Sequence, residues 1–241
     1  MHGQIPNMVR WMKMAELKAL IFDMDGLMID SERLYFEVER QIARRYGKEV
    51  KDETLWRMMG RRPIEGLTIF VRELGLPIGP AEAVEIRNDL MREKMKQDLL
   101  PMPGLFHIID SFHGRLNLAV STGAPQEFLD IAVDKLGIRD KFDVLQASDD
   151  LRSGKPDPEI FLKTCEKLGL NPRGAVVLED SGNGVVAGKR AGCSVIAVPS
   201  EYTRGQDFSP ADFVAASLFE AEKYIQRLLK RSAERFSRQG Q

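Results

Sequence analysis

Two carboxylates, Asp23 and Asp25, lie two residues apart at the end of a largely apolar run, residues 17–22. The run predicts a buried strand, and open α/β sheets bind their ligands beyond the carboxyl ends of the strands. Gly26 follows at once and permits a sharp turn of the backbone. By itself, an Asp-x-Asp-Gly sequence is as typical of a calcium-binding loop or an ordinary turn as of a catalytic pair. Three later segments favour the catalytic interpretation.

Polar groups also stand at three further strand or loop ends. The first set follows the apolar run 116–120, the second lies before a predicted helix, and the third follows the apolar run 175–178. Taken singly, each is typical of a turn, a helix cap or a solvated surface. Together they place acids, hydroxyls and one lysine at one edge of a sheet, which those simpler interpretations leave unexplained. The groups are Ser121, Thr122 and Gly123, then Lys155, then Glu179 and Asp180.

Four carboxylates at one edge would repel one another and raise one another's pKa values unless a cation were bound. Oxygen ligands without imidazole or thiolate suit Mg²⁺, which also ligates substrate phosphate. Lys155, the Thr122 hydroxyl and loop N–H groups are suited to hold the other phosphate oxygens. Aspartate is a phosphoryl-accepting nucleophile, and a second acid nearby can protonate the leaving oxygen and later activate water. The pattern predicts magnesium-dependent phosphoryl transfer.

The second half of the chain alternates short apolar runs with amphipathic helical stretches. Residues 126–136 and 157–168 are predicted helices, each followed by a glycine. This alternation is typical of a parallel sheet in an α/β fold. Residues 31–100 show helical periodicity without a strand pattern and are predicted to be a helical insertion. Both ends of this insertion should lie near the acids, where a domain can act as a lid.

Composition argues against several classes of function. The 241 residues include 35 basic and 36 acidic side chains, so the formal charge of -1 gives no global field for nucleic acid or an anionic membrane. Cys165 and Cys193 show no metal-ligand spacing and are predicted to be core thiols. No long apolar span stands out, so a reducing cytoplasm is the expected location. Residues 1–16 are interpreted as an extension, with an amphipathic membrane anchor as the less favoured alternative.

Three segments carry a specific resemblance to a known family. They are residues 20–32 (LIFDMDGLMIDSE), 154–161 (GKPDPEIF) and 177–185 (VLEDSGNGV). In this order and spacing they resemble the haloacid dehalogenase superfamily, in particular its β-phosphoglucomutase-like branch, over about residues 17–218. The resemblance implies a Rossmann-like parallel-sheet core formed by residues 17–30 and 103–241. It also implies a small α-helical cap inserted at residues 31–102.

The same resemblance implies roles for the four acids. Asp23 would be the nucleophile that forms an aspartyl-phosphate, and Asp25 would be the general acid and base. Asp23, Asp25 and Asp180 would bind Mg²⁺, with Asp25 contributing its backbone carbonyl. Glu179, beside Asp180, would be a direct or water-mediated ligand.

The resemblance further assigns the groups that would hold the phosphate. Thr122 takes the hydroxyl position of the second motif, with Ser121 as the alternative one residue earlier. Gly123 follows as flexible backbone whose N–H can face an oxyanion. Lys155 takes the position of the phosphate-binding lysine in the third motif.

A few positions bear on whether the phosphoryl group passes to water or back to a sugar. Asp25 favours phosphate-ester chemistry, because dehalogenases and phosphonatases of the superfamily do not keep this aspartate. β-Phosphoglucomutases carry a histidine where this chain has Tyr35, and their cap arginine falls at Pro63, next to Arg61 and Arg62. Without these two polar groups the cap would close less tightly, so water should attack the aspartyl-phosphate. The Asp-Gly-Leu and Glu-Arg-Leu-Tyr sequences also resemble pseudouridine-5′-phosphatase-like proteins.

The expected activity is therefore hydrolysis of a small phosphorylated sugar or nucleotide by a monomer, with Mg²⁺ as cofactor and no nucleic-acid or membrane partner. A sugar phosphomutase is the alternative. A non-catalytic phosphate- or partner-sensing protein is less favoured, because a binding module needs no nucleophile together with an acid/base. In the helical insertion, Arg87 and Lys94 are expected to be solvated helix charges, with contact to a substrate phosphate as the less favoured alternative.

Overall fold

The computed structural model describes residues 16–59 and 61–239, with side chains described as far as Lys230. Six parallel strands form one sheet in the order β3-β2-β1-β4-β5-β6. This arrangement confirms the expected Rossmann-like α/β fold. The strands are β1 (Ala19–Phe22), β2 (Asn117–Ser121), β3 (Val144–Gln146), β4 (Ala175–Glu179), β5 (Ser194–Ala197) and β6 (Phe213–Val214).

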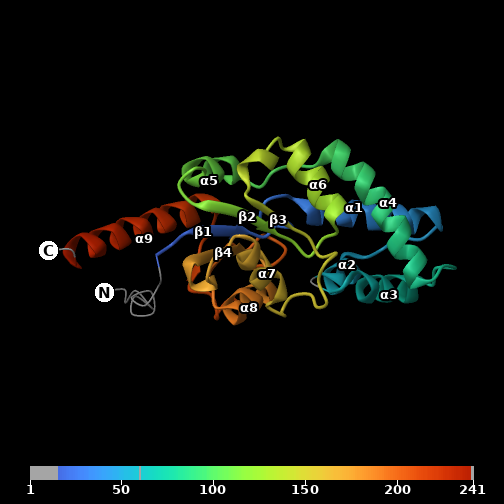
Figure 1. The fold of residues 1–241 in the computed structure, drawn as a ribbon. Coiled ribbons are helices and arrows are strands. Elements are labelled where there is room, and N and C mark those ends of the chain that lie inside the picture. The colour runs from blue at the N-terminus through green and yellow to red at the C-terminus, as the bar shows by residue number, and fades with distance from the viewer. Residues whose placement is uncertain (1–15, 60, 240–241) are drawn as a thin grey trace.

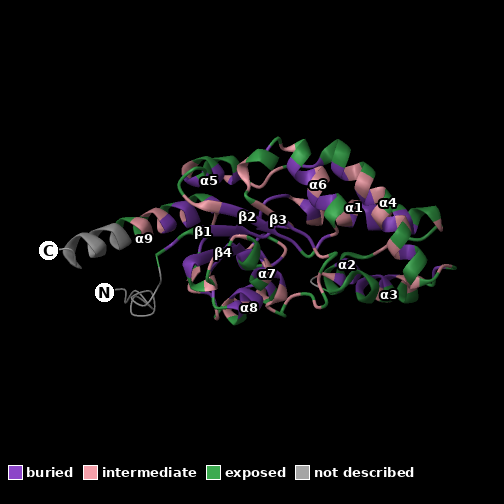
Figure 2. Cartoon of the chain, viewed as in Figure 1, coloured by how far each residue is buried: buried purple, intermediate pink, exposed green. Residues whose placement is uncertain are grey.

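Strand β1 lies in the middle of the sheet and is buried on both faces. Leu20 and Phe22 contribute to one apolar cluster, whereas Ala19 and Ile21 contribute to a second cluster. Because neighbouring side chains of a strand point to opposite faces, a strand that is apolar at every position needs cover on both sides. The central strands are correspondingly buried between two helical layers (Figure 2).

The two helical layers are built from the segments that connect the strands (Figure 1). Apolar side chains of α5, α6 and the start of α9 join the cluster that contains Leu20 and Phe22. Those of α7 and α8 join the cluster that contains Ala19 and Ile21. The helices are α5 (Leu105–Phe112), α6 (Gln126–Lys135), α7 (Glu159–Lys167), α8 (Gly182–Ala191) and α9 (Leu218–Gln239), with short 3-10 turns η2 (Arg139–Lys141) and η3 (Pro172–Gly174).

The chain adds its first three strands toward one side of the sheet and the later ones toward the other, so the direction reverses between the neighbouring strands β1 and β4. From β1 the chain adds β2 and then β3 on one side, after which α7 carries it across to β4 on the other side. In open α/β sheets, the crevice at such a reversal, outside the carboxyl ends of the strands, is where ligands bind. The topology therefore marks the ends of β1 and β4 as the place to look for a site.

Four further helices lie beyond this edge of the sheet, between β1 and α5 in the chain (Figure 1). Their two connections to the sheet run side by side: the Asp30 N–H donates to the Leu100 carbonyl at 3.0 Å, and the Met102 N–H donates to the Met28 carbonyl at 2.9 Å. The two ends of this inserted segment are therefore adjacent to each other, a few residues after the Asp-x-Asp loop in the chain. The helices are α1 (Ser31–Arg45), α2 (Asp52–Met58), α3 (Pro63–Leu74) and α4 (Pro80–Asp98), and we call them the inserted helices.

Most predicted elements are present, with ends shifted by a few residues. The predicted helices 126–136 and 157–168 correspond to α6 and α7. The two-residue strand β6 was not predicted, because so short a segment carries no periodic pattern. The proposed extension at residues 1–16 lies, except for Glu16, outside the described residues. In the part of the chain that the structure describes, no helix has both the length and the apolar character needed to cross a membrane.

Candidate active site

The carboxyl ends of β1, β2 and β4 bring the predicted site residues to one edge of the sheet. In the parallel register, Phe22 of β1 lies opposite both Val120 of β2 and Leu178 of β4. The residues that follow these positions therefore emerge side by side. They include Asp23 after β1, Thr122 after β2, and Asp180 after β4.

Lys155 connects the two acidic segments. Its ammonium group donates hydrogen bonds to the carboxylates of Asp23 and Glu179, and its side chain is only 14% exposed. Burial by itself would lower the pKa of Lys155, but the two carboxylates outweigh that effect and raise the pKa above its ordinary value. Lys155 is thus a fixed positive charge beside Asp23, where it can pair with an oxygen of a phosphoryl group.

Three buried acids have carboxylate oxygens within 4.8 Å of one another: Asp23, Glu179 and Asp180. Burial raises the pKa values of Asp23 and Asp180 well above the usual aspartate range, and the neighbouring carboxylates raise both further. The ammonium of Lys155 lowers the pKa of Asp23 but does not cancel the effect of burial. A set of oxygen donors that repel one another when no cation is present fits a hard divalent cation.

Gly26 allows the loop after β1 to approach this acidic cluster. Its φ is +75°, and a Cβ added there would lie 2.3 Å from a carboxylate oxygen of Asp180. Any other residue would both strain the backbone and collide with that carboxylate. The glycine identified in the sequence as a turn residue therefore also sets the distance between the Asp25 loop and Asp180.

Asp25 lies beside the three-acid cluster and is held there by hydroxyl groups. The Thr122 hydroxyl donates to the Asp25 carboxylate at 3.1 Å and accepts from the Ala124 N–H at 3.0 Å. Burial raises the pKa of Asp25, whereas hydrogen bonds from Ser31 and Thr122 lower it, and the effect of burial is larger. A carboxyl group with a raised pKa in a fixed position is suited to exchange protons with a bound ligand.

The two hydroxyls considered in the sequence point to different neighbours. The Ser121 hydroxyl lies 2.6 Å from that of Thr164 on α7, and both side chains are fully buried. Thr122, not Ser121, is therefore the hydroxyl that contacts an acid of the cluster region. Gly123 lines the same cavity as Lys155.

Glu179 has no exposed surface, and protein groups occupy both of its carboxylate oxygens. Oε1 accepts from Lys155, while Oε2 accepts from the N–H of Ser181 at 2.8 Å and from its hydroxyl at 2.9 Å. The Ser181 hydroxyl also caps α8 by accepting from the Gly184 N–H at 3.1 Å. Glu179 thus fixes the position of Lys155 and connects it to the first turn of α8, a function that the sequence pattern did not indicate.

Substitution of Gly184 by alanine is expected to disrupt this arrangement. A Cβ on Gly184 would lie 1.7 Å from Oε1 of Glu179, so the carboxylate would have to leave the position in which it holds Lys155. Alanine normally stabilises a helix relative to glycine by about 1 kcal/mol. Here we expect Gly184→Ala to lower the free energy of unfolding by about 2–4 kcal/mol and to reduce turnover, as measured by urea denaturation and phosphate release.

Gly205→Ala is the matched control, because no atom lies within 4 Å of a Cβ added at Gly205. Its stability and turnover should equal those of the unsubstituted protein. If Gly184→Ala behaved like Gly205→Ala, Glu179 would not be held as the structure places it.

The inserted helices contribute a buried arginine, so the expectation of a solvated charge at Arg87 is wrong. Its guanidinium carbon lies 5.1 Å from the ring centroid of Tyr35, and among the described residues its Nε has no hydrogen-bond partner. The sequence does contain a signal for this burial. Ala83, Arg87, Met91 and Met95 are spaced four residues apart along α4, and all four are buried.

A cavity of about 590 Å³ leads from the inserted helices to the strand-end loops, and we call it the Lys155 cleft. Gly123 and Lys155 belong to its core-side wall, together with residues from the 148–160 segment. Its opposite wall comes from the beginnings of α3 and α4. Lys155, whose ammonium group contacts Asp23, is thus one of the residues that line this cleft.

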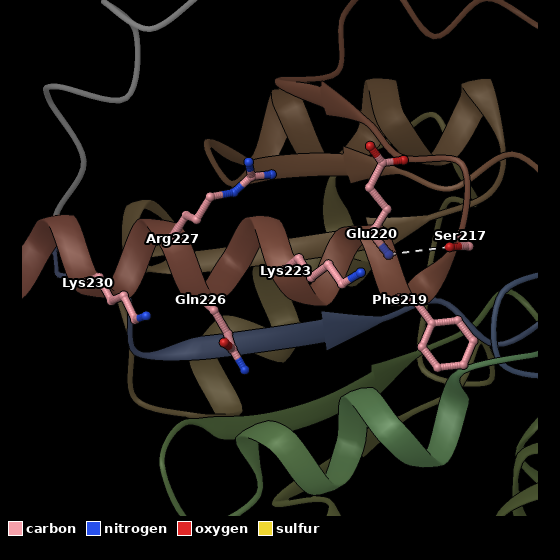
Figure 3. A pocket seen from close by; sticks show the side chains of 7 residues that line it. All are labelled: Ser217, Phe219, Glu220, Lys223, Gln226, Arg227 and Lys230. Atoms are coloured by element: carbon pink, nitrogen blue, oxygen red, sulfur yellow. Dashed lines mark hydrogen bonds between the residues drawn. The ribbon is translucent and has the colours of Figure 1, made fainter.

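A second cavity, of about 660 Å³, lies along α9 and is unrelated to the acids (Figure 3). All its lining residues come from the segment 217–230, and the close view shows their side chains projecting from that one segment. The helix lies at the end of the molecule away from the inserted helices (Figure 1). Neither Lys155 nor any acid of the cluster lines this hollow, so it is separate from the candidate active site at the strand ends.

Comparisons with known proteins agree with this placement. Residues 20–198 match the model of the haloacid dehalogenase-like hydrolase family. A phosphorylated carbohydrates phosphatase from Thermotoga maritima is 36% identical over 187 residues, which cover 73% of this chain and 82% of the relative. A mitochondrial (DL)-glycerol-3-phosphatase from Arabidopsis thaliana is 34% identical over 83% of this chain and 70% of the relative.

A solved structure extends the similarity to three dimensions. The putative β-phosphoglucomutase from Thermotoga maritima superposes with a TM-score of 0.72 at 30% identity, covering 90% of this chain and 99% of that protein. The matched segment of the family contains all four acids, Thr122 and Lys155. The chain belongs to the haloacid dehalogenase-like hydrolase family and is a phosphoric monoester hydrolase.

Proposed function

We propose that this protein is a magnesium-dependent phosphatase that hydrolyses small phosphomonoesters through an aspartyl-phosphate at Asp23. The observation that carries the proposal is the contact of Lys155 with Asp23 at the strand reversal, with Asp25 held two residues away by Thr122. A nucleophile, a fixed cation and a buried acid thereby share one edge of the sheet. Phosphoryl transfer needs mainly such positioning and charge stabilisation.

In the first half-reaction, a carboxylate oxygen of Asp23 attacks phosphorus and forms an acyl-phosphate bond. The bond between phosphorus and the ester oxygen breaks, and its electron pair leaves with that oxygen. Asp25 gives its proton to the leaving alkoxide, for which its raised pKa is suitable. Lys155 and the backbone N–H groups near Gly123 hold the non-bridging oxygens.

In the second half-reaction, water attacks the same phosphorus atom and the acyl-phosphate bond breaks. Asp25, now a carboxylate, accepts the proton that the water loses. The products are inorganic phosphate and the regenerated Asp23 carboxylate. All the side chains required come from one chain, so a monomer suffices.

The acids also account for the proposed cofactor. Asp23 and Asp180 would bind Mg²⁺ through their carboxylates and Asp25 through its backbone carbonyl, with Glu179 as a direct or water-mediated ligand. Both oxygens of Glu179 already accept hydrogen bonds from protein groups, which favours the water-mediated form for this residue. When bound, the cation supplies charge neutralisation on the phosphoryl oxygens.

The inserted helices are proposed to form a cap that covers the site during the reaction. They join the sheet through two adjacent connections, a geometry that suits hinge motion. The side chain at the mutase histidine position is Tyr35, whose pKa is raised by burial and by Asp25, so it stays a neutral phenol. The insertion therefore offers no titrating imidazole there, which favours water over a sugar hydroxyl as the second acceptor.

The similarity to named phosphatases guides the choice of substrates. Relatives include a fructose-1-phosphate phosphatase from Escherichia coli as well as the carbohydrate and glycerol phosphatases described above. The purified protein should release phosphate from members of a panel of phosphorylated sugars, polyols and nucleotides when Mg²⁺ is present. EDTA should abolish this release, and added Mg²⁺ should restore it.

The panel also tests the alternative. If β-glucose 1-phosphate yielded glucose 6-phosphate without free phosphate, the protein would be a phosphomutase. Unchanged phosphate release in EDTA would overturn the role of the cation.

A further inference from the structure

A short turn after β5 contacts both the acidic cluster and the inserted helices. The segment leaves the sheet beside the end of β4, where the Val198 N–H donates to the Glu179 carbonyl at 2.7 Å. The chain then turns back, and the Thr203 N–H donates to the Ser200 carbonyl at 3.3 Å. We call residues 200–204 the β5 turn.

Two hydroxyls of the β5 turn converge on one carboxylate oxygen of Asp180. The Thr203 hydroxyl lies 3.4 Å and the Ser200 hydroxyl 3.5 Å from Oδ2 of Asp180, and all three residues are buried. The Thr203 hydroxyl also accepts from the Ser200 N–H at 3.0 Å, which fixes its oxygen within the turn. The backbone of Gly26 approaches the same Oδ2, since a Cβ added there would lie 2.3 Å from it. The carboxylate of Asp180 therefore has little freedom to rotate.

Such hydroxyls bear on how Asp180 would bind a cation. Carboxylates that ligate a metal ion are themselves held by hydrogen-bond donors, which orient them toward the ion. With Oδ2 of Asp180 facing the β5 turn, Oδ1 is left for a cation shared with Asp23. Both contacts are longer than the roughly 2.8 Å of an ordinary hydroxyl–oxygen bond. We therefore expect each hydroxyl to contribute at the lower end of the usual range.

The residue beside Thr203 connects the β5 turn to the inserted helices. The ring of Tyr202 lies edge-on to that of Phe36 on α1, with ring centroids 5.5 Å apart and ring planes at 77°. This is a favourable geometry for an aromatic pair. The turn thus contacts Asp180 through two hydroxyls and α1 through the aromatic side chain between them.

We propose that Ser200 and Thr203 are positioning residues for the cation-binding carboxylate of Asp180, and that Tyr202 couples this positioning to α1. While Tyr202 packs on Phe36, the turn holds Oδ2 in place and the cation binds more tightly. Because coupling between two sites is reciprocal, a bound cation favours the same packing. The inference rests on the proposed function, since it requires a cation at Asp180.

The positioning role is tested by measuring Mg²⁺ affinity in the absence of substrate, by isothermal titration calorimetry. Ser200→Ala should raise the Kd for Mg²⁺ by about tenfold, the lower end of the effect of removing a partner from a metal ligand. Thr203→Val should do the same, whereas Thr203→Ser keeps the hydroxyl and should bind Mg²⁺ as the unsubstituted protein does. At saturating Mg²⁺, kcat of Ser200→Ala should recover, which a general loss of structure would not allow.

Ser209→Ala is the matched control for Ser200→Ala. Ser209 is exposed on the segment that follows the turn, and its N–H donates to Asp207 at 2.8 Å. The Kd for Mg²⁺ should be unchanged in this variant. Thermal unfolding in EDTA shows whether each variant is folded. If Ser200→Ala is not, the pair Thr203→Val and Thr203→Ser provides the same comparison.

Coupling to α1 is tested by a double-mutant cycle. Phe36→Leu and Tyr202→Leu each remove one ring and keep an apolar side chain. Each should raise the Kd for Mg²⁺ by about fivefold, the lower end of ordinary coupling between sites. The double variant should bind Mg²⁺ as tightly as either single variant, because the second change removes nothing further. Additive losses, or no loss in either single variant, would overturn the coupling.

The outcomes separate this inference from the proposed function. An unchanged Kd in Ser200→Ala and in Thr203→Val would overturn the positioning role, while a phosphatase inhibited by EDTA would remain. Absence of Mg²⁺ binding by the unsubstituted protein, with phosphate release unaffected by EDTA, would overturn the proposed role of the cation and with it this inference.

Discussion

Asp23→Asn should abolish turnover, with phosphate release lowered by at least about 10⁴-fold. The amide that replaces the carboxylate is a poor nucleophile toward phosphorus, so the aspartyl-phosphate cannot form. The change is isosteric and removes one charge from a buried cluster in which burial and neighbouring carboxylates raise the pKa of Asp23. The fold should therefore persist, as measured by circular dichroism and by thermal unfolding alongside the rate.

Asp110→Asn provides the matched control, because Asp110 lies on the exposed side of α5. It should turn over at the rate of the unsubstituted protein. Phosphate release by Asp23→Asn at a rate of the same order would remove Asp23 from the role of nucleophile.

Asp25→Asn should slow the first half-reaction only when the leaving group needs a proton, whereas it should slow the second half-reaction with every substrate. With an alkyl phosphate, loss of the proton donor should slow turnover by about 10²- to 10⁴-fold. p-Nitrophenolate leaves without a proton, so p-nitrophenyl phosphate should still phosphorylate Asp23. Because the water attack then lacks its base, we expect a burst of p-nitrophenol equal to the enzyme concentration, followed by a slow phase in stopped-flow absorbance.

The control for this burst is the double variant Asp23→Asn with Asp25→Asn, which should show none. A single slow phase in Asp25→Asn, with equal losses on the alkyl and aryl esters, would argue against its use as base in the second step. The hydrogen bond from Thr122 would then serve only to hold the loop.

The positions of the acids could be predicted because strand ends converge by geometry. Asp23 and Asp180 each follow an apolar run, and parallel strands place such residues at one edge whatever their order in the sheet. The order of the strands in the sheet could not be predicted from the sequence, because a pattern of apolar runs does not show that β1 pairs with both β2 and β4. The strand reversal became evident only from the structure.

Other features depend on contacts between distant segments. Sequence spacing could not decide between Ser121 and Thr122, because their difference lies in whether the side chain meets Thr164 or Asp25. The close approach of Gly184 to Glu179 is likewise a consequence of how α8 packs against the end of β4.

The central claim is that Asp23 carries the phosphoryl group between the two half-reactions. The most direct test is acid quenching of the enzyme during turnover of p-nitrophenyl phosphate, followed by intact-mass and peptide mass spectrometry. The account predicts a species heavier by one phosphoryl group, most abundant in Asp25→Asn, absent in Asp23→Asn, and located on the peptide that contains Asp23. Full turnover with no phosphorylated species in any variant, or with the group on another residue, would contradict it.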